Sequence, residues 1–175
     1  MEYIGNLETA EQKVLADSSA LLTTLRDNCA IEPTSAADAV RVLANIRDLA
    51  YENLNQIQHE YLILLSARHL ENEQIVPAGT SWQWNPRQTG GRDEPDLQGS
   101  TGAEILVSAE ITTSRRPVGT IDKRMRTTLL KLSSFAGQCF YFVRTSAMAA
   151  RASTIVNANE YEISVVVLPH AADEL

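Results

Sequence analysis

The chain has 175 residues, 44% of them hydrophobic, and a formal net charge of −7. These values fit one globular domain with a sizeable core, and they exclude a disordered chain and a protein that coats nucleic acid non-specifically. Two cysteines are too few for a disulfide scaffold, and neither a signal-peptide pattern nor a membrane-spanning apolar run is present, so we expect a cytoplasmic protein with no membrane contact.

The first 76 residues are predicted to form a helical N-terminal region. A helical stripe of apolar residues runs from Leu7 to about Asp27, and Pro33 interrupts the chain. From Ala36 to about Glu73 there is neither proline nor glycine, and apolar residues recur at steps of three and four, which predicts a second helix. A straight helix of this length would measure roughly 55 Å. Either it bends or breaks midway, as two helices folded over their own domain, or part of it packs on a second subunit. Its heptad-like stripe leads us to predict a homodimer through these N-terminal helices.

Residues 77–168 are predicted to form an α/β core. Three strands come first and suggest an antiparallel meander: Thr80–Trp84, Asp96–Gln98 and Glu104–Thr113. A helix, a buried strand, a second helix and a second buried strand follow: Thr120–Phe135, Cys139–Arg144, Ser146–Asn157 and Tyr161–Leu168. A crossover of this kind implies a parallel strand pair. The predicted class is therefore α/β with a mixed sheet, and residues 169–175 are expected to be a loose tail.

One acidic residue interrupts a strand that is otherwise suited to burial. Within Glu104–Thr113, Glu110 shares a face with Leu106 and Ser108, and a buried carboxylate costs several kcal/mol unless it is paired or binds a metal. Asp96 lies at the end of the preceding strand, so adjacent strands can bring the two carboxylates together. A divalent cation would relieve their repulsion and activate water against a phosphodiester. The alternatives are a turn role for Asp96 and a solvated edge position for Glu110.

Pro95-Asp96, followed after 13 residues by Glu110-Ile111-Thr112, resembles the PD-(D/E)XK motif of restriction-endonuclease-like nucleases. The order of elements over residues 50–168 is similar to that fold, a mixed β-sheet flanked by helices. The resemblance implies a metal-dependent DNA endonuclease of restriction or repair type. It also implies that Asp96, Glu110 and the main-chain carbonyl of Ile111 bind Mg²⁺ or Mn²⁺.

The chain departs from the motif at Thr112, where the family usually has a lysine that orients the attacking water. We expect Lys123, in the first turns of the following helix, to replace it, and we expect Lys131 to lie too far along that helix. Glu60, on the helix before the sheet, could add a third carboxylate. Lys123 and Glu60 could equally be ordinary solvated helix positions. Because the lysine is missing, the alternative function is a catalytically inactive nuclease-fold domain that binds nucleic acid or a protein partner.

Basic residues gather after the predicted metal site. Residues 115–131 carry six lysines and arginines against Asp122 alone. We expect four of them to hold the DNA backbone: Arg115, Arg116, Arg124 and Arg126. A plain solvated face is the alternative reading of this cluster.

Overall fold

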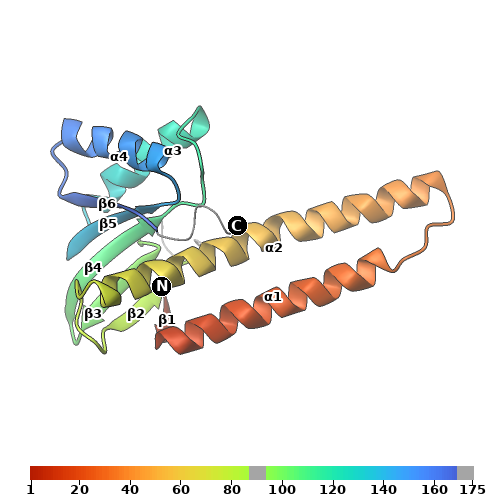
Figure 1. Cartoon of the computed structure of the whole chain (residues 1–175), viewed down its shortest axis with the longest axis horizontal. Coiled ribbons are helices and arrows are strands. Elements are labelled where there is room, and N and C mark those ends of the chain that lie inside the picture. Colours follow the sequence, from red (N-terminus) through yellow and green to blue (C-terminus); the bar gives the residue numbers. More distant parts are fainter. Residues whose placement is uncertain (87–93, 169–175) are drawn as a thin grey trace.

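The computed structural model describes residues 1–86 and 94–168, which form an α/β fold with four helices and one six-stranded mixed sheet (Figure 1). The elements in chain order are β1 Glu2–Gly5, α1 Leu7–Cys29, α2 Ala36–Asn72, β2 Ser81–Trp84, β3 Leu97–Thr101, β4 Glu104–Ile111, α3 Thr120–Leu132, β5 Gln138–Val143, α4 Ser146–Ala158 and β6 Ile163–Val167. The predicted α/β class is confirmed. The predicted tail, residues 169–175, lies outside the described residues.

The sheet keeps its strands in sequence order from β1 to β6. Strands β1 to β4 pair antiparallel, whereas β4, β5 and β6 pair parallel. Both the meander and the parallel crossover therefore follow the sequence prediction. Strand β1 was not predicted, because its four residues carry no alternating pattern strong enough to stand out; it adds an edge to β2.

Helices cover both faces of the sheet (Figure 1). On one face, Val107 and Ala109 of β4 and the two tryptophans of β2 pack with Leu62 and other residues of α2 in one core cluster. On the other face, α3 and α4 close a second cluster around β5 and β6. Alternation along each strand thus divides apolar side chains between two cores.

The two N-terminal helices form an antiparallel hairpin that extends beyond the sheet (Figure 1). Ser35 caps α2 by accepting a hydrogen bond from the Asp38 amide, and α2 then continues unbroken to Asn72. Its buried residues all lie between Glu60 and Leu70, so only its second half packs on the sheet. We call residues 15–57, which lie before this packed half and include the loop between the helices, the arm. No helix in the described part of the chain is long and apolar enough to cross a membrane.

Candidate functional site

Asp96 and Glu110 face each other where β3 and β4 meet. Leu97 is paired with Ala109 in the antiparallel register, so the next residue outward on each strand, Asp96 and Glu110, are cross-strand neighbours. Asp96 is 3% exposed and Glu110 is 5% exposed. The structure therefore brings together, in a nearly dry environment, the two carboxylates that the sequence analysis paired.

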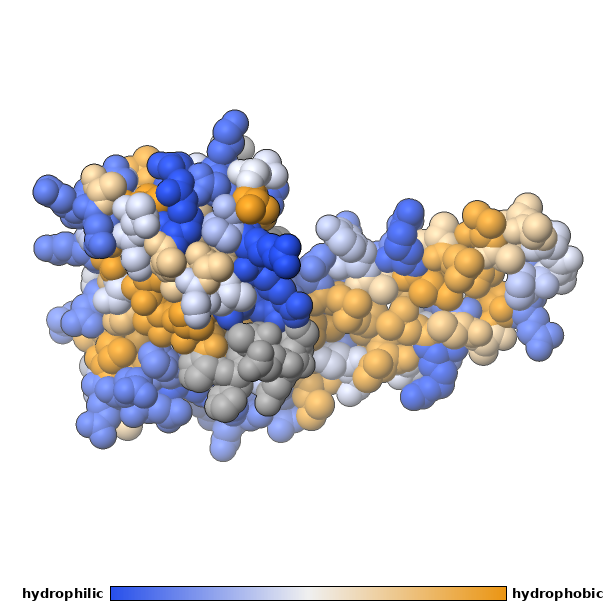
Figure 2. Space-filling view, turned by 45° about the horizontal axis from the view of Figure 1, so that its top comes forward, coloured by the Kyte–Doolittle hydropathy of each residue, from blue (hydrophilic) through white to orange (hydrophobic). Residues whose placement is uncertain are grey.

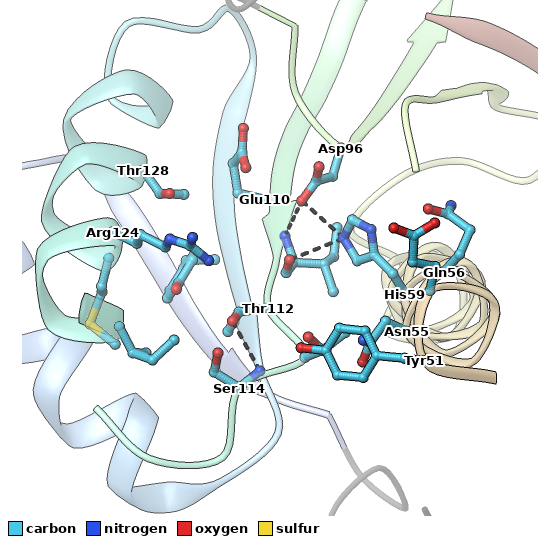
Figure 3. Close-up of a pocket in the computed structure, with 16 residues that line it drawn as sticks. Tyr51, Asn55, Gln56, His59, Asp96, Glu110, Thr112, Ser114, Arg124 and Thr128 are labelled. Carbon is cyan, nitrogen blue, oxygen red and sulfur yellow. Dashed lines mark hydrogen bonds and ion pairs between the residues drawn. The ribbon is translucent and has the colours of Figure 1, made fainter. Parts of the chain in front are cut away.

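His59 of α2 holds Asp96 from the side. Its Nε2 lies 3.3 Å from Asp96 Oδ2 and 3.2 Å from the Ile111 carbonyl oxygen (Figure 3). Its Nδ1 lies 3.0 Å from the Pro86 carbonyl oxygen. Burial by itself would lower the pKa of His59, but the hydrogen bonds with Asp96 and the two carbonyls outweigh it and raise the pKa. Because both ring nitrogens face acceptor oxygens, the geometry favours the doubly protonated imidazolium. Asp96 Oδ2 also accepts the Ile111 amide at 2.9 Å.

Glu110 has a different partner, Lys131 of α3. The Lys131 ammonium donates to Glu110 Oε1 at 2.7 Å and to the Glu94 carbonyl oxygen at 2.8 Å. Burial and the neighbouring Asp96 charge raise the pKa of Glu110 to about 7, although Lys131 acts in the opposite direction. The two carboxylates thus sit in unequal settings, one beside an imidazole and the other beside an ammonium.

An open pocket of about 450 Å³ lies over these carboxylates. One wall comes from α2 and presents Tyr51, Asn55 and Gln56, while Arg124 and Thr128 of α3 stand on the other side (Figure 3). The pocket therefore has an acidic floor and two different walls. The α2 wall carries an exposed aromatic ring and amide groups, and the α3 wall carries a guanidinium group. Such a combination suits a ligand that carries both phosphate and planar ring groups.

Two expectations about the helix residues differ from the structure. Neither lysine lines the pocket: Lys123 is exposed, whereas Lys131, which we expected to be too far along α3, contacts Glu110 directly. Residues 112–119 separate β4 from α3, so the helix begins beyond the end of the strand and, as it runs back, reaches Glu110 with its last turn. Glu60 is fully buried on the other side of α2, where it binds Lys13 at 2.9 Å, and it is not part of the pocket lining.

The four arginines are dispersed around the pocket. Arg124 lines it, and Arg115 and Arg116 are exposed on the segment that follows the pocket residues Thr113 and Ser114. Arg126 lies 3.3 Å from Asp122 on the exposed surface of α3. Of the four arginines predicted to hold the DNA backbone, Arg124 is therefore the one that lines the pocket over the carboxylates.

The donor atoms at the site fit a hard cation in part. Asp96 Oδ2 and the Ile111 carbonyl oxygen converge on one point, which the His59 Nε2 atom occupies, and Glu110 adds a second carboxylate. Mg²⁺ accepts one or two carboxylates and keeps several waters, which suits this set. Within residues 1–86 and 94–168 there is no group of three or more histidine, cysteine or acidic side chains arranged to hold a metal. A cation here would therefore depend on the two carboxylates, the Ile111 carbonyl and water.

Comparison with protein-family models, with curated proteins and with solved structures finds no match to this chain. The site is thus defined by its geometry alone.

Sequence reasoning missed His59, although this residue adjoins Glu60: one step along a helix turns a side chain by about 100°, which separates the pocket face from the face toward α1. His59 lies four and seven residues before the buried Ile63 and Ser66 and so shares their face of α2, but apolar periodicity alone does not mark a histidine on that face as a site residue.

Proposed function

We propose that this protein is a metal-dependent DNA endonuclease of the PD-(D/E)XK type with a restriction-endonuclease-like fold. The observation that carries the proposal is the pairing of two buried carboxylates, Asp96 and Glu110, with a lysine on one of them and Arg124 across the pocket. A buried acidic pair is costly unless something compensates it, and a cation at this point would do so. The meander followed by a parallel crossover is also the element order that the family resemblance implies.

In this proposal Asp96, Glu110 and the Ile111 carbonyl bind Mg²⁺ or Mn²⁺. When bound, the ion supplies Lewis-acid stabilisation of the phosphate and a more acidic water. Lys131 takes the role of the motif lysine, whose position is occupied by Thr112 in this chain. Its ammonium is held at Glu110 Oε1, where it orients the attacking water and offsets the negative charge that develops on the phosphate oxygens. Arg124 holds a neighbouring phosphate, which fixes the scissile bond over the two carboxylates.

His59 supports a second candidate function. Its Nε2 lies 3.2 Å from the Ile111 carbonyl oxygen and satisfies Asp96 without any metal. An imidazolium that permanently replaces the cation would leave a catalytically inactive nuclease-fold domain that binds nucleic acid or a protein partner through the same pocket. We prefer the first function because one open pocket holds both carboxylates together with Arg124, the combination that a metal ion and a phosphate would use.

A cleavage assay tests the proposal. Supercoiled and linear DNA are incubated with Mg²⁺ or Mn²⁺ and with wild type or the isosteric variants Asp96→Asn and Glu110→Gln. Lys131→Met is compared with Lys123→Met, a matched control on the exposed surface of the same helix. We expect both carboxylate variants and Lys131→Met to lose cleavage by roughly 10²-fold or more, and Lys123→Met to retain it.

The outcomes separate the two functions. Cleavage that survives both carboxylate changes would show that this pocket is not the active site. Wild type that binds DNA but does not cut it with either metal would favour the inactive domain. Equal losses in Lys131→Met and Lys123→Met would remove the role given to Lys131 while leaving the carboxylate pair in place.

A further inference from the structure

The arm carries large, exposed apolar side chains that belong to neither of the two core clusters. Four leucines are more than half exposed: Leu15 at 59%, Leu22 at 62%, Leu43 at 66% and Leu54 at 55%. Val40 is also exposed, at 67%. In the space-filling view, hydrophobic side chains run along the length of the arm (Figure 2). Contiguous apolar surface of this extent is uncommon on a monomer and marks an interaction surface.

These side chains are not the ones that hold the hairpin together. The seam between α1 and α2 uses other residues, such as Leu21, Leu49 and Ile57, which line the same gap between the helices. At about 100° per residue, Leu15 and Leu22 lie roughly a quarter-turn from the α1 side of this seam. Leu43 and Leu54 lie about as far from the α2 side, in the same rotational sense. Because the helices are antiparallel, equal rotations in the same sense place both stripes on one face of the arm.

The opposite face of the arm is different in character. Its exposed positions are small or polar, among them Ala20, Thr24 and Asn45. Within the apolar face, the charged residue between Leu43 and Leu54 is Arg47, which is already bonded to Asp48 at 2.7 Å. The apolar face therefore carries no uncompensated charge at its centre that would oppose contact between two identical surfaces.

We propose that this apolar face of the arm is the interface with a second copy of the same chain, joined as a four-helix bundle. The size of the face supports this occupant. The α2 part of the arm is roughly 33 Å long, and two helices side by side are about 20 Å wide, so one face offers about 600 Å². Two such faces together bury about 1,200 Å², which is the lower bound for a specific dimer. A two-fold axis also matches the leucines of one arm with those of the other, as an isologous interface requires.

The proposal is independent of the nuclease function, because the leucines of this face do not line the pocket over Asp96 and Glu110. It gives the unpacked half of α2 a reason to be apolar on two faces: one seam is for α1 and the other is for the partner. A helix that needed only its own hairpin would carry one apolar stripe.

The test is the oligomeric state of the full chain and two double variants, measured by sedimentation velocity from 1 to about 100 µM. Leu22→Glu with Leu43→Glu places two charges in the apolar face. Ala20→Glu with Asn45→Glu places the same charges on the opposite face as a matched control. All four positions are exposed, so the monomer fold should persist, and far-UV circular dichroism verifies it.

We expect sedimentation to give wild type and the control a mass of about twice 19.3 kDa and the apolar-face variant a mass of 19.3 kDa. The dissociation constant of the dimer should rise at least about 100-fold in the apolar-face variant. Cys29 is the exposed cysteine and Cys139 is buried, so donor- and acceptor-labelled Cys29 gives a second measurement: energy transfer on mixing in wild type, and its loss in the apolar-face variant. Monomeric wild type across the whole range would overturn the proposal. So would a dimer that persists in the Leu22→Glu, Leu43→Glu variant, since the contact would then lie elsewhere.

Discussion

Replacing Glu110 by glutamine should change how the stability of the metal-free protein depends on pH. The pKa of Glu110 is raised from its ordinary value of 4.5 to about 7 by burial and by Asp96. Between these values the unfolded chain ionises while the folded chain keeps its proton, so the free energy of unfolding falls as the pH rises. The difference corresponds to about 3 kcal/mol, since each pH unit is worth about 1.4 kcal/mol. His59 acts in the same sense: its raised pKa gives stability that is complete below 6.5 and is lost as the pH rises through the folded value.

Glutamine has nearly the same shape as glutamic acid but cannot ionise. In EDTA we therefore expect Glu110→Gln to match wild type near pH 5 and to be more stable by about 3 kcal/mol at pH 8. Trp82 and Trp84 are each 1% exposed, so their fluorescence reports urea unfolding. Glu104→Gln is the matched control, because Glu104 is an exposed carboxylate at the other end of the same strand.

Metal ions provide the second arm of this experiment. A cation between Asp96 and Glu110 would let both ionise, so Mn²⁺ should restore stability to wild type at pH 8 and have less effect on Glu110→Gln. The reasoning is refuted if wild type in EDTA is as stable at pH 8 as at pH 5. It is also refuted if Glu110→Gln declines with pH as steeply as the Glu104→Gln control.

Two further predictions concern groups outside the carboxylate pair. Lys13→Met should lower the free energy of unfolding in urea by about 3 kcal/mol, because it leaves the fully buried Glu60 without its ammonium partner. Adding Glu60→Gln should recover most of this loss. A double variant that is no more stable than Lys13→Met would contradict the prediction. Arg124→Ala should weaken DNA binding and reduce the slope of log affinity against log salt concentration by about one. Arg126 lies outside the pocket, so Arg126→Ala should leave this slope nearly unchanged. Identical slopes for wild type and both variants would show that Arg124 does not contact a phosphate.

Periodicity in the sequence was sufficient for the elements of the core. The alternation around Glu110 and the apolar runs before Arg144 and Leu168 predicted strands that the structure contains, and the crossover between the last two predicted their parallel pairing. These features are local, or follow from a handedness rule, so a single sequence contains them. The pairing of Asp96 with Glu110 was also within reach, because adjacent strands in a meander have few possible registers.

The partners of those carboxylates could not be read in this way. The choice between Lys123 and Lys131 depended on how far beyond the end of β4 the helix α3 begins, and the choice between His59 and Glu60 depended on a rotation of about 100° about the axis of α2. An error of one residue in helix phase, or of two turns in helix position, exchanges one candidate for another. Both quantities are set by how a helix packs on the sheet and not by its own pattern.

The amino-acid sequence by itself determined the α/β class, the meander and crossover, the acidic pair on neighbouring strands and the long uninterrupted helix from Ala36. Hydrophobic periodicity and strand adjacency determine these features, and both are properties of the linear chain. Tertiary structure alone decided that His59 and Lys131 are the partners of Asp96 and Glu110, that Glu60 turns inward to Lys13, and that the arm exposes a second apolar face. The physical reason is that side chains far apart in sequence meet only once helices have been placed on the sheet, and that placement is the sum of many packing contacts over both cores.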